Sequence, residues 1–117
     1  MNDCITTFFS AWGDPDPASR ASKTAASAAP SLYYNDPNAP APIVGMDGYL
    51  AYIASFSEMA PGASAQVAHI DANDACARIT VNFVFGPNMA KRGQYFAEIA
   101  DDKITRIIGF TGMGEPT

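Results

Sequence analysis

The spacing of apolar residues predicts a short amphipathic helix near the start of the chain, over residues 3–12. Its apolar positions recur at i, i+3, i+4 and i+7, which places them on one face of a helix. A run of Gly, Asp and Pro at residues 13–17 then breaks the pattern. The residues of the apolar face are Ile5, Phe8, Phe9 and Trp12.

Two further helices are predicted from composition and from helix-breaking residues. The alanine-rich stretch 18–29 permits a helix with Asp16 as its N-cap and Pro17 at its first position, and Pro30 is expected to end it. A third helix follows the segment 45–48, carries apolar residues from Tyr49 to Phe56, and closes at Pro61.

The rest of the chain shows the alternation of β-strands. A first strand over residues 31–36 stops at Pro37. Four longer strands follow over residues 65–71, 75–85, 91–100 and 103–111, joined by short segments of turn-forming residues. Short connections predict antiparallel neighbours, and helices followed by strands indicate an α+β fold rather than alternating βαβ units.

Composition narrows the class of protein. The 117 residues are expected to form one domain over 1–117, with 48 % hydrophobic and only 16 % charged residues. The net charge is −5 and Lys and Arg do not cluster, which argues against nucleic acid as a partner. No apolar run approaches the length of a membrane span and no signal peptide is visible, so we expect a cytoplasmic protein that does not bind membranes.

The sequence contains few residues of the types that bind metals, and no cofactor-binding motif. The two cysteines, Cys4 and Cys76, are far apart and form no CxxC motif, which predicts reduced thiols. His69 is the only histidine, so one chain cannot build a zinc site with two histidines. No phosphate-binding or nucleotide-binding glycine motif occurs, and no metal or cofactor is predicted.

The predicted sheet has one apolar face that must be buried against other parts of the protein or a partner. Ile79, Val81, Phe83 and Phe85 share a face of one strand, and Ile107 lies on another strand. Three short helices can cover only part of such an apolar sheet. The remainder is expected to close on a ligand, on a second subunit, or on both.

The order of elements and several short segments resemble the nuclear transport factor 2-like superfamily. The segments are residues 8–12 in the first helix, 34–37 at the end of the first strand, 45–49 before the third helix, and 92–99 and 103–110 in the last two strands. Within that superfamily the chain looks most like SnoaL-like polyketide cyclases and ketosteroid-isomerase-like proteins. The resemblance implies a cone-shaped α+β barrel, with helices packed in a strongly bent, mainly antiparallel sheet, an apolar pocket, and no cofactor.

Asp36 is the main catalytic candidate that the resemblance suggests. In the ketosteroid-isomerase pattern, the Asp of an Asp-Pro pair at the end of the first strand moves a proton between carbon atoms, and Asp36-Pro37 stands at that place. By the two-residue period, Leu32, Tyr34 and Asp36 share one strand face, which we expect to be the interior of the cone. The alternative is that Asp36 only caps the turn before Pro37.

The oxyanion donors of that pattern are only partly present. The pattern uses a tyrosine and a protonated aspartic acid as these donors. The tyrosine lies in the first helix, at a position that matches Phe8 or Phe9, which have no hydroxyl group. The aspartic-acid position matches Gln94, whose amide is a weaker donor. We therefore expect Tyr34 and Gln94 to polarise a substrate oxygen. His69 and Asp71 share a strand face and are a further acid–base candidate, although a lone strand histidine is more often a surface residue.

Two functional hypotheses follow. The first is a small-molecule pocket protein that performs isomerisation, cyclisation or hydration on an apolar, ring-containing substrate; the second is a non-catalytic binding or association module whose aromatic residues fill the cone. A pocket of at least roughly 300 Å³ with Asp36 in its wall would separate them. The residues expected to contact a ligand are Phe8, Trp12, Phe56, Phe83, Phe96 and Ile107.

A homodimer through the outer face of the sheet is also expected. The low charge content and the habit of the resembled family both favour it. The outward positions that should lose exposure in such a dimer are Asn82, Val84, Ile108 and Phe110.

Overall fold

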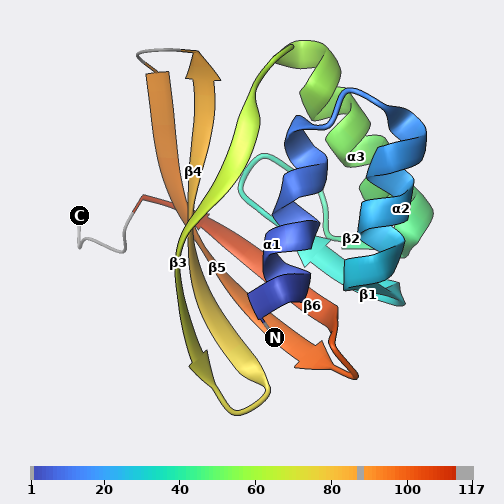
Figure 1. Cartoon of the computed structure of the whole chain (residues 1–117), viewed down its shortest axis with the longest axis vertical. Helices are drawn as coiled ribbons and strands as arrows, with labels where there is room; N and C mark the ends of the chain where they lie inside the picture. The colour runs from blue at the N-terminus through green and yellow to red at the C-terminus, as the bar shows by residue number, and fades with distance from the viewer. Residues whose placement is uncertain (1, 87–88, 113–117) are drawn as a thin grey trace.

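The computed structural model describes residues 2–86 and 89–112. Within these residues, helices pack against one side of a single mixed sheet (Figure 1). The elements in chain order are α1 (Asn2–Ser10), the 3-10 helix η1 (Ala11–Gly13), α2 (Pro17–Ser27), β1 (Ala28–Asn35), β2 (Ile43–Val44), α3 (Met46–Met59), β3 (Ser64–Asn73), β4 (Cys76–Gly86), β5 (Met89–Ala100) and β6 (Lys103–Thr111).

The sheet has the strand order β2-β1-β6-β5-β4-β3. The strands β3 to β6 pair antiparallel with their chain neighbours, as the short predicted connections require, whereas β1 pairs parallel with β6. The register shifts once along each pair of long strands, and the strands bend around the helices (Figure 1). The expected α+β fold is confirmed, with a sheet that is curved rather than closed among the described strands.

The start of α2 follows the sequence signals, but its end does not. Asp16 caps the helix by accepting a hydrogen bond from the backbone N–H of Ala18, and Pro17 occupies the first position. The helix ends at Ser27, and Pro30 lies inside β1 rather than at the end of the helix. The β1–β6 register shifts between Ala28 and Tyr33, and a proline without an N–H is tolerated at such an irregularity.

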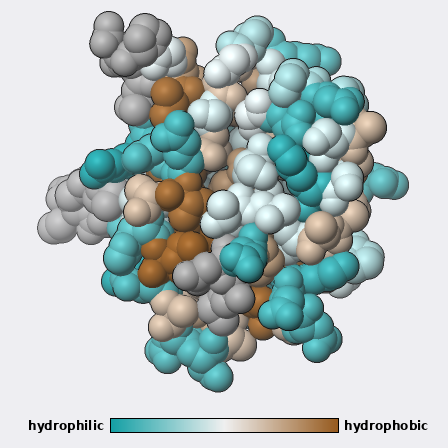
Figure 2. Space-filling view, in the orientation of Figure 1, coloured by the Kyte–Doolittle hydropathy of each residue, from teal (hydrophilic) through white to brown (hydrophobic). Residues whose placement is uncertain are grey.

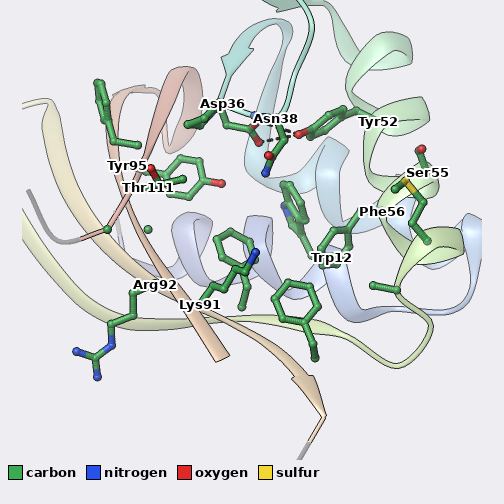
Figure 3. A pocket seen from close by; sticks show the side chains of 18 of the residues that line it. Trp12, Asp36, Asn38, Tyr52, Ser55, Phe56, Lys91, Arg92, Tyr95 and Thr111 are labelled. Carbon is green, nitrogen blue, oxygen red and sulfur yellow. Dashed lines mark hydrogen bonds between the residues drawn. The ribbon is translucent and has the colours of Figure 1, made fainter. Parts of the chain in front are cut away.

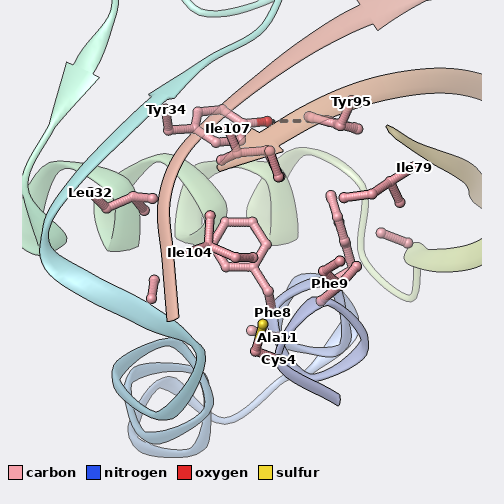
Figure 4. Packing of buried hydrophobic residues seen from close by; sticks show 14 of the residues in the cluster. Cys4, Phe8, Phe9, Ala11, Leu32, Tyr34, Ile79, Tyr95, Ile104 and Ile107 are labelled. Atoms are coloured by element: carbon pink, nitrogen blue, oxygen red, sulfur yellow. Dashed lines mark hydrogen bonds between the residues drawn. The ribbon is translucent and has the colours of Figure 1, made fainter. Parts of the chain in front are cut away.

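The core lies between α1 and the concave face of the sheet (Figure 4). Phe8, Phe9, Ile104 and Ile107 are fully buried there. Inward positions of β4 and β6 alternate with more exposed ones, as the two-residue period predicts. Two of the expected ligand contacts, Phe8 and Ile107, are therefore part of the packed core.

The strand side and the helix side of the molecule differ in polarity on the face shown in Figure 2. In the view of Figure 2, strongly apolar side chains gather over the strands, whereas the side chains over the helices are mostly hydrophilic or of middle hydropathy. No helix in residues 2–86 and 89–112 is long and apolar enough to cross a membrane.

Candidate functional site

A pocket of about 1090 Å³ opens between α3, the turn after β1 and the strands β4 to β6 (Figure 3). It exceeds the size that separates a binding pocket from a filled cone, and Asp36 lies in its wall. The lining residues are mainly aromatic and apolar: Trp12, Asp36, Pro37, Asn38, Pro40, Tyr52, Ser55, Phe56, Met59, Ala60, Phe83, Phe85, Lys91, Arg92, Gly93, Tyr95, Phe110, Thr111 and Gly112.

The Asp36 carboxylate accepts hydrogen bonds from both the turn and the pocket. Its Oδ1 accepts from the backbone N–H groups of Asn38 and Ala39 at 2.8 and 2.9 Å. Its Oδ2 accepts from the Tyr34 hydroxyl at 2.5 Å, and the Tyr52 hydroxyl lies 2.8 and 2.9 Å from the two oxygens. Asp36 therefore caps the turn and faces the pocket at once, and protein donors occupy the lone pairs that a general base would use.

A chain of hydroxyl groups extends from Asp36 toward Tyr95. A tyrosine hydroxyl has one proton, and that of Tyr34 is donated to the carboxylate. The Tyr95 hydroxyl, 3.1 Å from that of Tyr34, must then donate its own proton to Tyr34. Burial raises the pKa of both phenols above the ordinary value of 10.0, so both are neutral hydrogen-bond donors near neutral pH.

Tyr52 is the third hydroxyl of this cluster and the most exposed of them. Burial, and then its hydrogen bond to Asp36, raise its pKa above 10.0. Its proton is directed at the carboxylate, so its oxygen is left with lone pairs, and the same holds for Tyr95. The protons of all three phenols point toward Asp36, and the cluster therefore offers acceptor groups to a ligand.

Gly109 makes room for the Tyr95 ring. The two residues are partners across β5 and β6. A Cβ atom at position 109 would lie 2.5 Å from Cε2 of Tyr95 and 2.9 Å from its Cζ, which is closer than atoms can approach. A glycine inside a strand often marks such a close approach, and here it allows the phenol to reach Tyr34.

Trp12 holds the aromatic wall of the pocket together. Its indole ring lies 4.9 Å from that of Phe56, 5.7 Å from Phe83 and 6.0 Å from Tyr52, measured between centroids, all at steep angles. Its Nε1–H donates to the buried Tyr49 hydroxyl at 2.8 Å. Edge-to-face contacts and this hydrogen bond fix the ring orientations, so the wall is formed before a ligand arrives.

Four of the predicted catalytic and ligand-binding residues line this pocket: Trp12, Asp36, Phe56 and Phe83. Tyr34 is fully buried behind Asp36. It contacts the pocket wall through its hydrogen bonds to Asp36 and Tyr95 and through ring contacts with Trp12 and Tyr52.

Gln94 and Phe96 lie on the outer face of β5, contrary to expectation. Gly93, Tyr95 and Ala97 are the buried residues of this strand, and Phe96 is 40 % exposed. Successive side chains of a strand point to opposite faces, so an offset of one residue moves Gln94 away from Asp36 and puts Tyr95 in its place.

His69 and Asp71 do pair, but neither residue lines the pocket. His69 Nε2 lies 3.1 Å from Asp71 Oδ1, and the Arg78 guanidinium donates to Asp71 Oδ2 at 2.6 Å. Arg78, and then His69, lower the pKa of the Asp71 carboxyl. All three side chains are well exposed, with 65 % exposure for His69, as in a solvated surface ion pair.

Several lining residues were not among the predicted site residues, and Tyr52, Tyr95 and Lys91 are three of those that carry polar groups. A signal for two of them exists in β5. Lys91, Gly93 and Tyr95 are on one parity and Arg92 and Gln94 on the other, so the small and aromatic residues identify the inner face. Among the described residues, no group of three or more His, Cys, Asp or Glu side chains could hold a metal ion.

Comparison with known proteins gives a structural likeness and no sequence match. No protein-family model and no curated protein matches the chain. A candidate isomerase of the SnoaL-like family from Agrobacterium tumefaciens has a TM-score of 0.83 at 20 % identity, covering 96 % of this chain and 97 % of that chain. A protein with a ketosteroid isomerase-like fold from Catenulispora acidiphila, in complex with trimethylamine, has a TM-score of 0.77 at 14 % identity, covering 95 % and 86 %.

A candidate polyketide cyclase from Sinorhizobium meliloti is similar in the same way, with a TM-score of 0.73 at 16 % identity over 93 % of this chain and 94 % of that chain. At such identities the likeness shows the fold. The fold that the sequence segments resemble is therefore confirmed as that of SnoaL-like and ketosteroid-isomerase-like proteins, and the function has to be argued from the pocket.

Proposed function

We propose that this protein binds a small, mainly apolar molecule that contains a ring and carries a hydroxyl group. The observation that supports this most is the pocket of about 1090 Å³ whose wall combines the rings around Trp12 with one polar cluster. The ring of the ligand lies against Trp12, Phe56 and Phe83. Apolar pockets with a few convergent polar groups are the usual form of small-molecule sites.

The polar cluster selects for a hydrogen-bond donor. The hydroxyl protons of Tyr34, Tyr52 and Tyr95 are directed along the chain that ends at Asp36, and the oxygens of Tyr52 and Tyr95 retain lone pairs. In Figure 3 the Tyr52 hydroxyl points at the Asp36 carboxylate, and the Tyr95 hydroxyl lies below it. A ligand hydroxyl can donate there, whereas an ether cannot.

Binding of two matched probes by calorimetry tests this function. We expect 2-naphthol to bind about fivefold tighter than 2-methoxynaphthalene, the effect of one neutral hydrogen bond. Tyr95→Phe should remove most of that preference, because the acceptor oxygen is lost. His69→Ala, an exposed substitution outside the pocket lining, is the control and should leave both affinities unchanged. Equal binding of the two probes to the unmodified protein would contradict the proposal.

Proton-transfer catalysis is a second candidate, supported by the position of Asp36 in the pocket wall. One lone pair of its Oδ2 becomes free when Tyr52 turns its hydroxyl away, because Tyr34 is then the one described donor left on that oxygen. Asp36 can then act as the base in isomerisation, cyclisation or hydration of a ring-containing substrate.

The double-bond shift of cyclohex-3-enone, followed by ultraviolet absorbance, tests this candidate. Asp36→Asn should lower the rate by on the order of 10²–10⁴-fold, the usual contribution of a general base. Tyr52→Phe should raise the rate or leave it unchanged, since it frees a lone pair of Asp36. A rate that is the same with and without Asp36 would remove it from the chemistry and leave the binding function.

A second copy of the chain is the proposed partner of the outer sheet face. Phe110, which also lines the pocket, is 59 % exposed, and Phe96 pairs in register with Ile108 on the neighbouring strand. These outward residues are contiguous across β5 and β6, and large apolar side chains gathered on one face are typical of association surfaces. A two-fold pairing of this face with itself would cover them.

A further inference from the structure

Lys91 is a charged side chain directed into a mainly aromatic pocket. It belongs to the inner parity of β5, with Gly93 and Tyr95, and it lines the pocket. Its side chain extends across the pocket, whereas the neighbouring Arg92 points away (Figure 3). Arg92 donates from Nε to the Asn82 side chain at 3.0 Å. The Lys91 amine has no hydrogen bond or ion pair within residues 2–86 and 89–112.

The negative charge of Asp36 has hydrogen-bond donors around it, whereas the positive charge of Lys91 has no such partner among the described residues. Asp36 receives hydrogen bonds from two backbone N–H groups and two phenols. Lys91 receives no compensation from the described protein groups, so the unmet charge in the pocket is positive. Lys91 is exposed at the pocket wall, so water screens its charge, and an anionic partner placed there gains a modest attraction.

We infer that the ligand carries an anionic group, a carboxylate, which pairs with Lys91 while the ring of the ligand lies against Trp12, Phe56 and Phe83. The inference rests on the proposed binding function and names the class of ligand, an aromatic or alicyclic carboxylic acid. The ligand then has two polar ends. Its hydroxyl group donates a hydrogen bond to Tyr52 or Tyr95, and its carboxylate pairs with Lys91. An ammonium ligand is disfavoured, because Lys91 repels it.

Three probes that share a ring test this assignment by calorimetry at pH 7.5: 2-naphthoate, its neutral isostere 2-naphthamide, and 2-naphthylmethylammonium. The unmodified protein should bind the carboxylate about fivefold tighter than the amide, the effect of a partly exposed ion pair, and should bind the ammonium more weakly than the amide. In Lys91→Met, which keeps an unbranched apolar chain, the affinities for carboxylate and amide should become equal. Added salt should reduce the preference in the unmodified protein and have no such effect in the variant.

Lys103→Met is the matched control, since it removes the same charge by the same substitution outside the pocket lining. It should retain the preference for the carboxylate. A preference that survives Lys91→Met, or one that Lys103→Met also abolishes, would overturn the role of Lys91. Equal binding of all three probes would overturn it too while leaving the binding function intact. Failure of all three to bind would instead contradict the binding function on which the inference rests.

Discussion

Replacing Asp36 with Asn tests how much the polar cluster contributes to stability. The carboxylate accepts hydrogen bonds from Asn38, Ala39, Tyr34 and Tyr52. An amide oxygen can keep the two backbone N–H groups, but the amide nitrogen then faces the two phenols and reverses the donor direction. Hydrogen bonds to a charged group contribute about 1 kcal/mol more than neutral ones. With two phenol bonds losing that assistance, we expect the free energy of unfolding to fall by about 2 kcal/mol.

Urea unfolding followed by the fluorescence of Trp12, the single tryptophan, measures this loss directly. A change of about 2 kcal/mol corresponds to a decrease in Tm of about 8 °C for a chain of this length. Asp71→Asn is the matched control, because its carboxylate bonds only to exposed His69 and Arg78, and it should change stability by less than about 0.5 kcal/mol. If Asp36→Asn were as stable as Asp71→Asn, the hydrogen-bonded cluster would not be a stabilising unit of the fold.

Three further predictions concern other parts of the structure. Gly109→Ala should destabilise the protein by about 1–3 kcal/mol in urea unfolding and weaken 2-naphthol binding, because its methyl group displaces the Tyr95 ring; unchanged binding would separate Tyr95 from the site. Burial raises the pKa of Tyr34, Tyr49 and Tyr95 above that of the unfolded chain. The contribution of these phenols to the free energy of unfolding should therefore be fully present below pH 10 and be lost as the pH rises above it. In the folded protein at pH 10.5, absorbance at 295 nm should show most tyrosines still protonated, and full ionisation without unfolding would contradict the burial. Sedimentation should report a dimer that Phe110→Glu converts to a monomer, whereas a monomeric unmodified protein at micromolar concentration would rule out the sheet-face dimer.

The sequence predicted the order of elements well because each rests on local signals. The apolar spacing from Ile5 to Trp12, the Asp16-Pro17 start of α2, and the short turns between the long strands all act within a few residues. The short strand β2 and the parallel pairing of β1 with β6 could not be predicted, since both depend on contacts between segments far apart in the chain. The same holds for Pro30, whose place inside β1 depends on the irregular pairing with β6.

A pocket-lining residue at the end of an element could be predicted from the sequence. Residues inside a strand were missed where the alternation of side chains determines which face of the sheet they occupy. Asp36 follows directly from the Asp-Pro pair after β1, and Leu32 and Tyr34 share its face as expected. The family pattern that the sequence resembles places Gln94 toward the pocket, but an offset of one residue puts it on the opposite face from Tyr95. The contribution of Tyr52 depends on how α3 packs beside the turn after β1, which no local signal encodes.

The proposed function requires a ring of the ligand to bind against Trp12 beneath Asp36. A titration of the ¹⁵N-labelled protein with 2-naphthol, followed by nuclear magnetic resonance, tests it most directly. We predict the largest shifts for the indole N–H of Trp12, whose ring lines the pocket, and for the amides of Asn38 and Gly93 in the pocket wall. Shifts confined to the exposed surface around His69 and Asp71, with the Trp12 signal unchanged, would contradict the claim.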